Sequence, residues 1–189
     1  MQTPVFSPKD PFITQLDQAV SKDSDADATG AVRSLLCRSF RDQAITLPPE
    51  MIQPLPDRYA RRLLYASPEL GYSIIAMTWG PGQGTPVHDH SGMWCVEGIW
   101  AGALEVVQYE ILEHAEERYR FESVGSINAG VGSAGSLIPP HEYHTIRNPD
   151  PVDCAVSIHI YSGNMCQCNC FMARRDGWYE RVSRRLGLD

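Results

Sequence analysis

The sequence lacks any concentration of positive charge. Its 16 Lys and Arg residues are outnumbered by 23 Asp and Glu residues, the formal net charge is −7, and no run of basic residues exceeds three. A surface that binds nucleic acid needs clustered Lys and Arg side chains. The composition therefore argues against a nucleic-acid partner and favours a small molecule or another protein.

Long apolar runs and a secretion signal are also missing. No apolar run approaches the length that crosses a membrane, and residues 1–30 do not combine a basic segment with an apolar one. We therefore expect a cytoplasmic protein with no membrane partner. In that reducing compartment the cysteines should remain thiols rather than form disulfides; they are Cys37, Cys95, Cys154, Cys166, Cys168 and Cys170.

The chain length of 189 residues fits one domain of ordinary size, and 43% of the residues are apolar. We expect a single domain over residues 1–189. Apolar residues at helical spacing predict two amphipathic helices, over 12–21 and 31–43. A proline-rich connector, 47–56, follows them and ends an N-terminal helical segment over residues 1–56.

From about residue 58 the pattern changes to short apolar and β-branched stretches separated by Gly and Pro. This spacing predicts an antiparallel sandwich or barrel of short strands. The predicted strands are 59–66, 72–79, 93–100, 103–112, 118–124, 136–139, 143–148 and 154–162. Residues 176–189 are predicted to end in a short helix.

The predicted strand at 156–162 carries apolar side chains on one face and Ser157, His159 and Tyr161 on the other. Two interpretations stay open for this polar face. It could be exposed to solvent, or it could line the interior of a barrel, in which case the barrel would hold a functional cavity.

Two histidines stand one residue apart in the stretch 87-VHDHSGMWC-95. Side chains at i and i+2 of a strand point to the same face, so His88 and His90 are predicted to reach one metal ion together. A lone His-x-His pair is weak evidence, because two exposed or hydrogen-bonded histidines would look the same.

The wider spacing resembles the two motifs of the cupin superfamily. Gly82, His88, His90 and Gly102 fall at the spacing of the first motif. Pro139, His144 and Asn148 fall at that of the second, with His141 where glycine is usual. The resemblance implies a mainly β fold, a cupin-type antiparallel β-barrel over residues 57–189 with short N-terminal helices, and a metal held by His88, His90 and His144.

One position departs from the cupin pattern. The motif glutamate is missing, Cys95 stands in its place, and Glu97 comes two residues late. Three neutral imidazoles resemble a non-haem iron site in which the carboxylate of the two-His-one-carboxylate pattern has been lost. A thiolate from the substrate is the natural anion to replace it.

At this point the sequence resembles the thiol dioxygenases of the cupin superfamily, cysteine dioxygenase in particular, from about Tyr59 to Phe171. The resemblance implies Fe(II) as cofactor, and O2 and a small-molecule thiol as the partners. It also implies catalytic roles for the Ser-x-His-x-Tyr residues Ser157, His159 and Tyr161. Cys95 matches a cysteine that is joined to this tyrosine by a thioether in animal enzymes.

The segment 59-YAR-61 matches the residues that grip the substrate in that family, so Tyr59 and Arg61 are the predicted substrate-binding residues. Arginine pairs with a carboxylate through two parallel hydrogen bonds, and its presence favours L-cysteine as the substrate. Two alternatives stay open: 3-mercaptopropionate or mercaptosuccinate as substrate, and Arg62 in place of Arg61 as the residue facing the cavity.

Other interpretations remain open beside the enzyme. A cupin could be a non-catalytic binding domain, although such a domain has no need of the Ser-x-His-x-Tyr strand. The cluster 166-CQCNC-170 matches no standard zinc spacing and is expected to be a set of thiols near the mouth of the barrel. We expect a monomer or a weak dimer.

Overall fold

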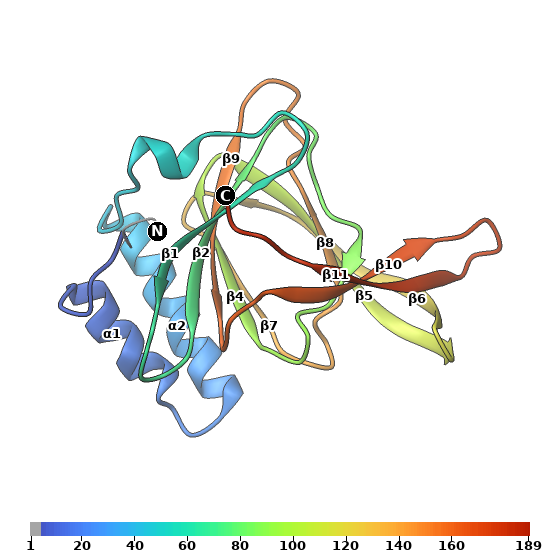
Figure 1. Cartoon of the computed structure of the whole chain (residues 1–189), viewed down its shortest axis with the longest axis horizontal. Coiled ribbons are helices and arrows are strands. Elements are labelled where there is room, and N and C mark those ends of the chain that lie inside the picture. Colours follow the sequence, from blue (N-terminus) through green and yellow to red (C-terminus); the bar gives the residue numbers. More distant parts are fainter. Residues whose placement is uncertain (1–4) are drawn as a thin grey trace.

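The computed structural model describes residues 5–189 of the chain. Two helices, α1 (Pro11–Val20) and α2 (Asp25–Arg41), and a 3-10 turn, η1 (Pro49–Ile52), precede all of the strands (Figure 1). The strands are β1 (Ala60–Ala66), β2 (Ser73–Trp79), β3 (Val87–His88), β4 (Cys95–Ala101), β5 (Ala103–Ala115), β6 (Arg118–Gly130), β7 (Ala134–Leu137), β8 (His144–Arg147), β9 (Ala155–Tyr161), β10 (Gln167–Ala173) and β11 (Tyr179–Arg185).

All the strand pairs are antiparallel and fall into two groups. One is a five-stranded sheet in the order β1-β2-β9-β4-β7, and the other closes on itself in the order β10-β11-β6-β5-β8-β3. The expectation of a mainly β, antiparallel barrel with short N-terminal helices is confirmed.

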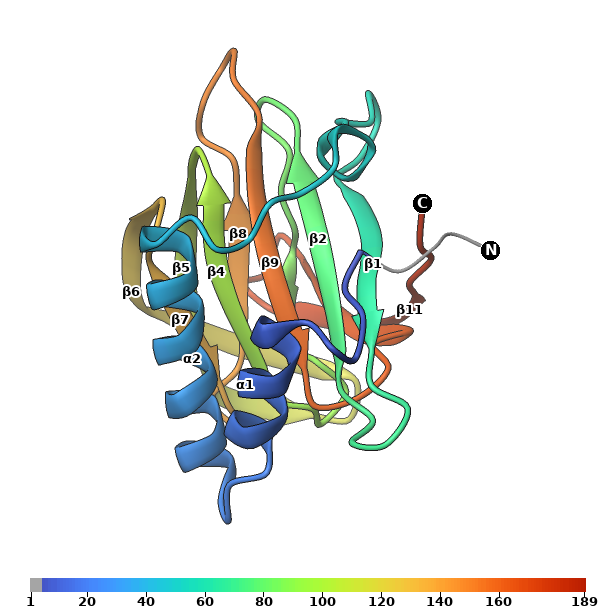
Figure 2. The ribbon, with the colours of Figure 1, turned by 90° about the vertical axis from the view of Figure 1, so that its left-hand side faces the viewer.

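The two helices cover the outer face of the five-stranded sheet, in front of β4 and β9 (Figure 2). Leu16 of α1 and Leu36 of α2 are fully buried there against Ile158 and Ile160 of β9. Burial of each such side chain contributes about 1.5–3 kcal/mol of hydrophobic free energy. A second apolar cluster fills the inner side of the sheet, so β9 lies between two cores.

Capping side chains explain where helices α1 and α2 begin. Asp10 caps α1 by accepting a hydrogen bond from the backbone N–H of Phe12, and Ser24 caps α2 by accepting one from Asp27. Helix α2 therefore begins at Asp25, six residues before the predicted start. The acidic residues of its first turn, Asp25 and Asp27, interact favourably with the N-terminal end of the helix dipole.

The predicted helix over 176–189 is wrong. Residues Tyr179–Arg185 form strand β11, which pairs with β10 along its full length, and β10 was itself not predicted. The reversal between the two strands is built on Gly177, whose φ of 80° is readily adopted only by glycine. Pairing with a neighbouring strand has overridden the local sequence pattern here.

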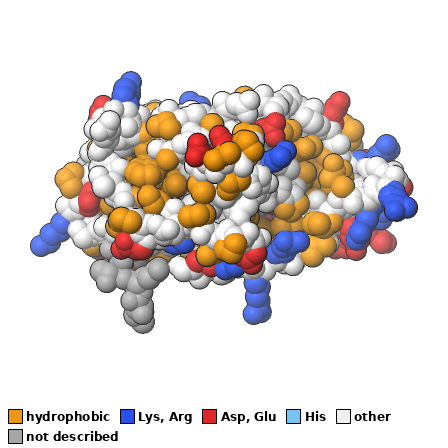
Figure 3. All heavy atoms as spheres, turned by 90° about the horizontal axis from the view of Figure 1, so that it is seen from above, with side chains coloured by type: hydrophobic (Ala, Val, Ile, Leu, Met, Phe, Trp, Pro, Cys, Tyr) orange, Lys and Arg blue, Asp and Glu red, His pale blue; other side chains and the backbone are white. Residues whose placement is uncertain are grey.

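The β5–β6 and β10–β11 hairpins extend to one end of the molecule, where acidic and basic side chains are interspersed (Figures 1 and 3). Ion pairs join Arg118 to Asp176 and Arg181 to Glu117 in this region. Such exposed pairs contribute little to stability, typically about 0–1 kcal/mol each. Within residues 5–189, no helix is both long and apolar enough to cross a membrane.

Helix α2 approaches strand β4 most closely at Gly98. A Cβ atom at this position would lie 2.6 Å from Cε2 of Phe40, which is buried under the sheet. We expect Gly98→Ala to lower the free energy of unfolding by about 1–3 kcal/mol, because the phenyl ring must shift in a packed core. Urea-induced unfolding of the purified variant measures this loss.

Gly125→Ala is the matched control, because it lies on strand β6 with no atom within 4 Å of a Cβ at that position. It should change the stability by no more than about 0.5 kcal/mol. Equal unfolding midpoints for the two variants would contradict the packing described here.

Candidate metal centre and active site

Three histidines from separate parts of the chain meet at one point. His88 ends strand β3 and lies opposite His144 of strand β8, and His90 follows in the next turn. One ring nitrogen from each lies within 4.8 Å of those of the other two. The three residues could therefore hold a metal ion, and they are the single such group of His, Cys, Asp and Glu found over residues 5–189.

The prediction that His88 and His90 lie on the same face of one strand was wrong. Strand β3 ends at His88, so the two residues do not share one strand face. The turn at residues 91–92, where Ser91 and Gly92 have positive φ angles, follows the pair. The carboxylate of Asp89 accepts hydrogen bonds from the backbone and side-chain N–H groups of Asn169 and fixes this loop to β10.

Each of the three imidazoles is oriented by an acceptor at Nδ1. The distances are 3.2 Å from His88 to the Pro86 carbonyl, 2.9 Å from His90 to Glu142 Oε2, and 2.9 Å from His144 to the Glu142 carbonyl. A carbonyl oxygen only accepts, and Glu142 Oε2 already accepts from the backbone N–H of His90. The Nδ1 atoms therefore carry the hydrogens, which leaves Nε2 as the metal-binding nitrogen of each ring.

The charge states of His88 and His90 suit metal binding. Burial, together with the neighbouring histidines, lowers the pKa of His88 well below its usual value and that of His90 to about 3. Both rings are therefore neutral near pH 7, as ligands must be. The residues present thus fit a divalent metal ion: three neutral or neutralisable imidazoles in a buried site, with their free nitrogens grouped together.

His144 and Glu97 form the charged part of this centre. Burial disfavours the charge on His144, but the Glu97 carboxylate outweighs it and raises the pKa of the imidazole. Burial likewise acts to raise the pKa of Glu97, but the histidines around it, His144 first, lower it to about 2. The two shifts have one cause: the His144 imidazole and the Glu97 carboxylate each stabilise the charged form of the other.

A chain of hydrogen bonds runs along the inner face of β9. The indole N–H of Trp79 donates to Ser157 Oγ at 2.9 Å, Ser157 Oγ lies 2.7 Å from His159 Nε2, and His159 Nδ1 lies 3.5 Å from the Tyr161 hydroxyl. Trp79 can only donate, so Ser157 accepts from it. The Glu97 carboxylate, 3.5 Å from His159 Nδ1, favours the hydrogen of the neutral imidazole on Nδ1, which leaves Nε2 to accept from the Ser157 hydroxyl.

The polar face of this strand is not exposed to solvent. All seven residues of β9 are buried, and His159 and Tyr161 line a cavity. Of the two interpretations that the sequence left open, the solvent-exposed one is wrong.

Cys95 lies directly opposite Tyr161 in the β4–β9 register. Both side chains are buried, and Cys95 Sγ lies 3.9 Å from His159 Nδ1. Burial raises the pKa of the Cys95 thiol and that of the Tyr161 hydroxyl, so both groups keep their hydrogens near pH 7.

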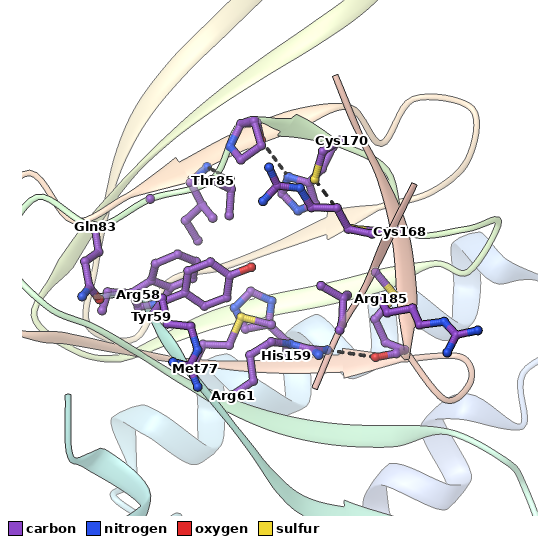
Figure 4. A pocket seen from close by; sticks show the side chains of 18 of the residues that line it. Arg58, Tyr59, Arg61, Met77, Gln83, Thr85, His159, Cys168, Cys170 and Arg185 are labelled. Carbon is purple, nitrogen blue, oxygen red and sulfur yellow. Dashed lines mark hydrogen bonds between the residues drawn. The ribbon is translucent and has the colours of Figure 1, made fainter. Parts of the chain in front are cut away.

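The cavity beside these groups has a volume of about 340 Å³. Five of the predicted site residues line it: Tyr59, Arg61, His88, His159 and Tyr161. Figure 4 labels Tyr59, Arg61 and His159 among the lining side chains. Ser157 and Cys95 are buried and do not line it, and neither do His90 and His144. The ring of Tyr59 stacks on that of Trp79 at 4.5 Å, which fixes one wall.

The structure distinguishes Arg61 from Arg62. Arg61 lines the cavity, where its two terminal nitrogens donate to the Gly187 and Met165 carbonyls and its Nε has no partner. Arg62 points the other way and donates to the carbonyls of Met51 and Gln53 near η1. Arg61 is thus the arginine with an unused N–H group on the cavity side of the sheet.

The cysteines of the 166–170 cluster separate. Cys168 and Cys170 line the cavity with their sulfurs 3.9 Å apart, whereas Cys166 is exposed. Cys170 lies in register with His88 across the β10–β3 pair. His141, the other uncertain residue of the second motif, is exposed and hydrogen-bonds to Glu110 away from the centre.

Three residues at this site were missed by the sequence analysis or given no role there. Glu142 orients two of the three histidines, Glu97 contacts His144, and Trp79 donates to Ser157. The sequence carried a signal for two of them: Glu142 stands two positions before a predicted ligand, and Glu97 stands two positions after the residue at the motif position.

Comparison with known proteins identifies the family. The family model described as "Cysteine dioxygenase type I" matches residues 11–174. The chain belongs to this family. The resemblance inferred from the motifs is therefore confirmed, and the match reaches beyond the predicted barrel into helix α1.

Curated relatives include cysteine dioxygenase type 1 from rat and from human, each 24% identical over 111 residues. The match covers 54% of this chain and 50% of each relative, so the chain spans about half the length of the curated relatives it matches.

Similar solved structures include an uncharacterized protein with a double-stranded β-helix domain from Klebsiella pneumoniae (TM-score 0.49, 15% identity, 66% of this chain and 89% of that one). Another is oxalate oxidase in complex with glycolate (TM-score 0.47, 16% identity, 64% and 59%). At these scores no property of either protein is transferred to this chain.

The centre predicts which histidines control metal binding. We expect His144→Ala to lose the bound metal, whereas His141→Ala, three residues earlier and exposed, should keep it. In the wild type, metal at 100 times its dissociation constant should stabilise the fold by about 2.7 kcal/mol. Metal analysis and thermal unfolding with and without added Fe(II) measure both effects. Full metal content in His144→Ala would contradict the assignment.

Proposed function

We propose that the protein is a non-haem Fe(II) thiol dioxygenase that oxidises L-cysteine with O2 to cysteine sulfinic acid. The observation that carries this proposal is one cavity lined by His88 of the three-histidine group, by His159 and Tyr161 of the Ser157–His159–Tyr161 chain, and by Arg61. Membership of the cysteine dioxygenase type I family supports the reaction class.

The reaction is balanced without another electron donor. Both oxygen atoms of O2 become bonded to the substrate sulfur, which loses four electrons, and O2 gains the same four. Fe(II), held by His88, His90 and His144, would supply redox and Lewis-acid chemistry. The remaining tasks fall to the protein: binding the substrate, orienting it and placing hydrogen-bond donors beside the reacting atoms.

Arg61 is positioned to hold the substrate carboxylate. It is only 5% exposed, and two backbone carbonyls fix its guanidinium plane before any substrate arrives. Its remaining N–H groups, including the unpartnered Nε, are available to an acid. Tyr59, stacked on Trp79, would form the adjoining apolar wall.

Tyr161 lies beside the histidine group. Its ring lies 5.8 Å from that of His90, and burial keeps its hydroxyl protonated. The Trp79–Ser157–His159 chain directs a hydrogen toward the Tyr161 oxygen, so the phenol hydrogen is free to point into the cavity. We therefore assign Tyr161 to hydrogen bonding of the substrate or oxygen, with His159 and Ser157 as the residues that position it.

Two alternatives differ in what the cavity holds. Another thiol acid, 3-mercaptopropionate or mercaptosuccinate, would use the same centre and the same arginine. A non-catalytic binding domain would have no need of the buried Ser157–His159–Tyr161 chain and Arg61 beside three histidines, which supports the enzyme. A cytoplasmic location is supported by the six cysteines, all of which are unpaired.

The direct test is O2 consumption by the Fe(II)-loaded protein with L-cysteine, 3-mercaptopropionate, cysteamine and mercaptosuccinate, with the sulfinate identified by mass. We expect thiol-dependent O2 uptake that is faster with the three thiol acids than with cysteamine, because Arg61 can pair with a carboxylate. Among the acids we expect L-cysteine to be fastest, as the resemblance of 59-YAR-61 implies. Arg61→Gln should raise the KM for L-cysteine by about 10–100-fold, the loss of one charged hydrogen bond.

Cysteamine provides the control for Arg61, since it is a thiol without a carboxylate. Its KM should change little in Arg61→Gln, and an equal loss with both thiols would show a structural effect instead. A preference for another thiol acid would correct the substrate and keep the chemistry. Bound iron without thiol-dependent O2 uptake would favour the binding-domain alternative.

We also propose a thioether between Cys95 and Tyr161. Their directly opposite positions on neighbouring strands support it. Forming the bond removes the thiol hydrogen and one ring hydrogen, and the two electrons released reduce O2 to hydrogen peroxide.

Mass spectrometry of peptides from the aerobically iron-treated protein tests this bond. We expect one linked species, lighter by two hydrogen atoms than the two separate peptides, that contains both Cys95 and Tyr161. Cys95→Ser and Tyr161→Phe should each abolish it, whereas Cys154→Ser should leave it unchanged. Two separate peptides at full recovery would contradict the proposal.

A further inference from the structure

The cavity gathers positive charge that the sequence does not concentrate in any one stretch. Its lining includes four arginines and one aspartate: Arg58, Arg61, Arg184, Arg185 and Asp57. Four positive charges and one negative charge leave a net charge of +3 on these side chains, whereas the whole chain carries −7. A cavity lined by charge of one sign concentrates ligands of the opposite sign. This cavity therefore favours anions, and more strongly than one bound carboxylate would require.

Arg184 differs from the two arginines that already have strong partners. Arg58 is held by ion pairs with two aspartates, and Arg61 donates through its terminal nitrogens to two backbone carbonyls. Within the described chain Arg184 forms no ion pair, and the one hydrogen bond of its side chain runs from Nη2 to the Met172 sulfur at 4.0 Å. A thioether sulfur is a weak acceptor, so the donors of Arg184 are available to a ligand.

Strand β11 directs Arg184 to the cavity side of the β10–β11 hairpin. Arg184 lies opposite Cys168 in the strand register, and directly opposite residues of an antiparallel pair share one face of the sheet. Cys168 lines the cavity together with Tyr59 and Arg61 (Figure 4). Arg185 also borders the cavity, but as the next residue along the strand it projects to the opposite face.

Arg61 and Arg184 act on the same wall residue, Tyr59. Burial raises the pKa of the Tyr59 hydroxyl, and the charges of Arg61 and Arg184 both oppose this rise. Charges act appreciably on one another only within about 10 Å at ordinary salt concentrations, so both guanidinium groups lie near this wall. Arg61 is buried and Arg184 is exposed. The wall therefore carries one cation in its inner part and one at its outer end.

We propose that Arg184 provides a second anion position in the cavity, for a thiol that carries two carboxylates. The inner carboxylate would pair with Arg61 and the outer one with Arg184. This inference rests on the proposed function, which brings the thiol to the histidine centre and one carboxylate to Arg61. The cavity volume of about 340 Å³ lies in the range of sites that hold molecules larger than a three-carbon acid. L-Cysteine has one carboxylate and would leave the position at Arg184 to water.

The competing interpretation is that Arg184 is a solvated charge that attracts every anion alike. Such a field would act on all thiol acids and would be shared with Arg185, whereas a binding position acts on the second carboxylate alone. Mercaptosuccinate and 3-mercaptopropionate separate the two interpretations, because they differ by one carboxylate. Their affinities for the Zn(II)-loaded protein, measured by titration calorimetry, require no turnover.

We expect the wild type to bind mercaptosuccinate about 10-fold or more tightly than 3-mercaptopropionate, which is the gain from one charged hydrogen bond. Arg184→Gln should remove this preference, since the amide keeps a polar side chain without the charge or the paired donors. A preference that survives in Arg184→Gln would mean that the second carboxylate binds elsewhere, for example to the zinc, and would overturn the proposal. An equal loss of affinity for both acids would overturn it as well.

Arg185→Gln is the matched control, because it removes the same charge from the adjacent residue on the opposite face of the strand. It should keep the preference for mercaptosuccinate, and loss of the preference in both variants would show the general field instead. If mercaptosuccinate binds through Arg184 but no thiol drives O2 uptake by the iron form, the proposed function fails and this inference stands. If O2 uptake is robust while Arg184→Gln keeps the preference, only this inference fails.

Discussion

The candidate metal centre depends on Glu142, a residue outside the group of three histidines that could hold the ion. Glu142 holds the Nδ1–H of His144 with its carbonyl and that of His90 with its carboxylate, at 2.9 Å each. Because both hydrogens are directed outward, both Nε2 lone pairs face inward. Without these acceptors each ring could rotate or change tautomer, and three imidazoles close together would not amount to a site. The same carboxylate also accepts from the backbone of His90, so it fixes the turn together with the ring.

The site also depends on strand β9, which places a chain of hydrogen-bonded polar side chains inside an apolar barrel. Its outward residues, Ile158 and Ile160, pack under the helices, while Ser157 and His159 face inward between β2 and β4. Burying these polar side chains is tolerable because Ser157 bonds both Trp79 and His159, which leaves the chain internally satisfied. The helices α1 and α2 thus take part in the function indirectly: they bury the outer face of the strand whose inner face orients Tyr161 (Figure 2).

The sequence predicted those parts of the site that depend on local spacing. Eight of the strands and the grouping of His88, His90 and His144 followed from alternation and motif spacing, although β3 proved too short for the strand argument used. Glu142 and Glu97 did not follow, because their importance comes from contacts with residues about 50 positions away along the chain, such as those of Glu142 with His90 and Glu97 with His144. Strand β11 was missed for a similar reason. Residues 179–185 carry no strong strand pattern, and their conformation is set by pairing with β10.

The last strands also explain why Arg61 can act as a rigid clamp. Beyond β11 the chain turns back along β1, where Gly187 accepts from Arg61 Nη1 and Asp189 exchanges hydrogen bonds with the Arg61 backbone. Arg58 pairs with the Asp189 carboxylate and holds this segment in place. An arginine that is already ordered loses less conformational entropy on binding than a free one, so more of the interaction with a carboxylate remains as affinity. The segment that the sequence analysis took for a helix therefore contributes to the cavity by fixing the side chain that we assign to the substrate.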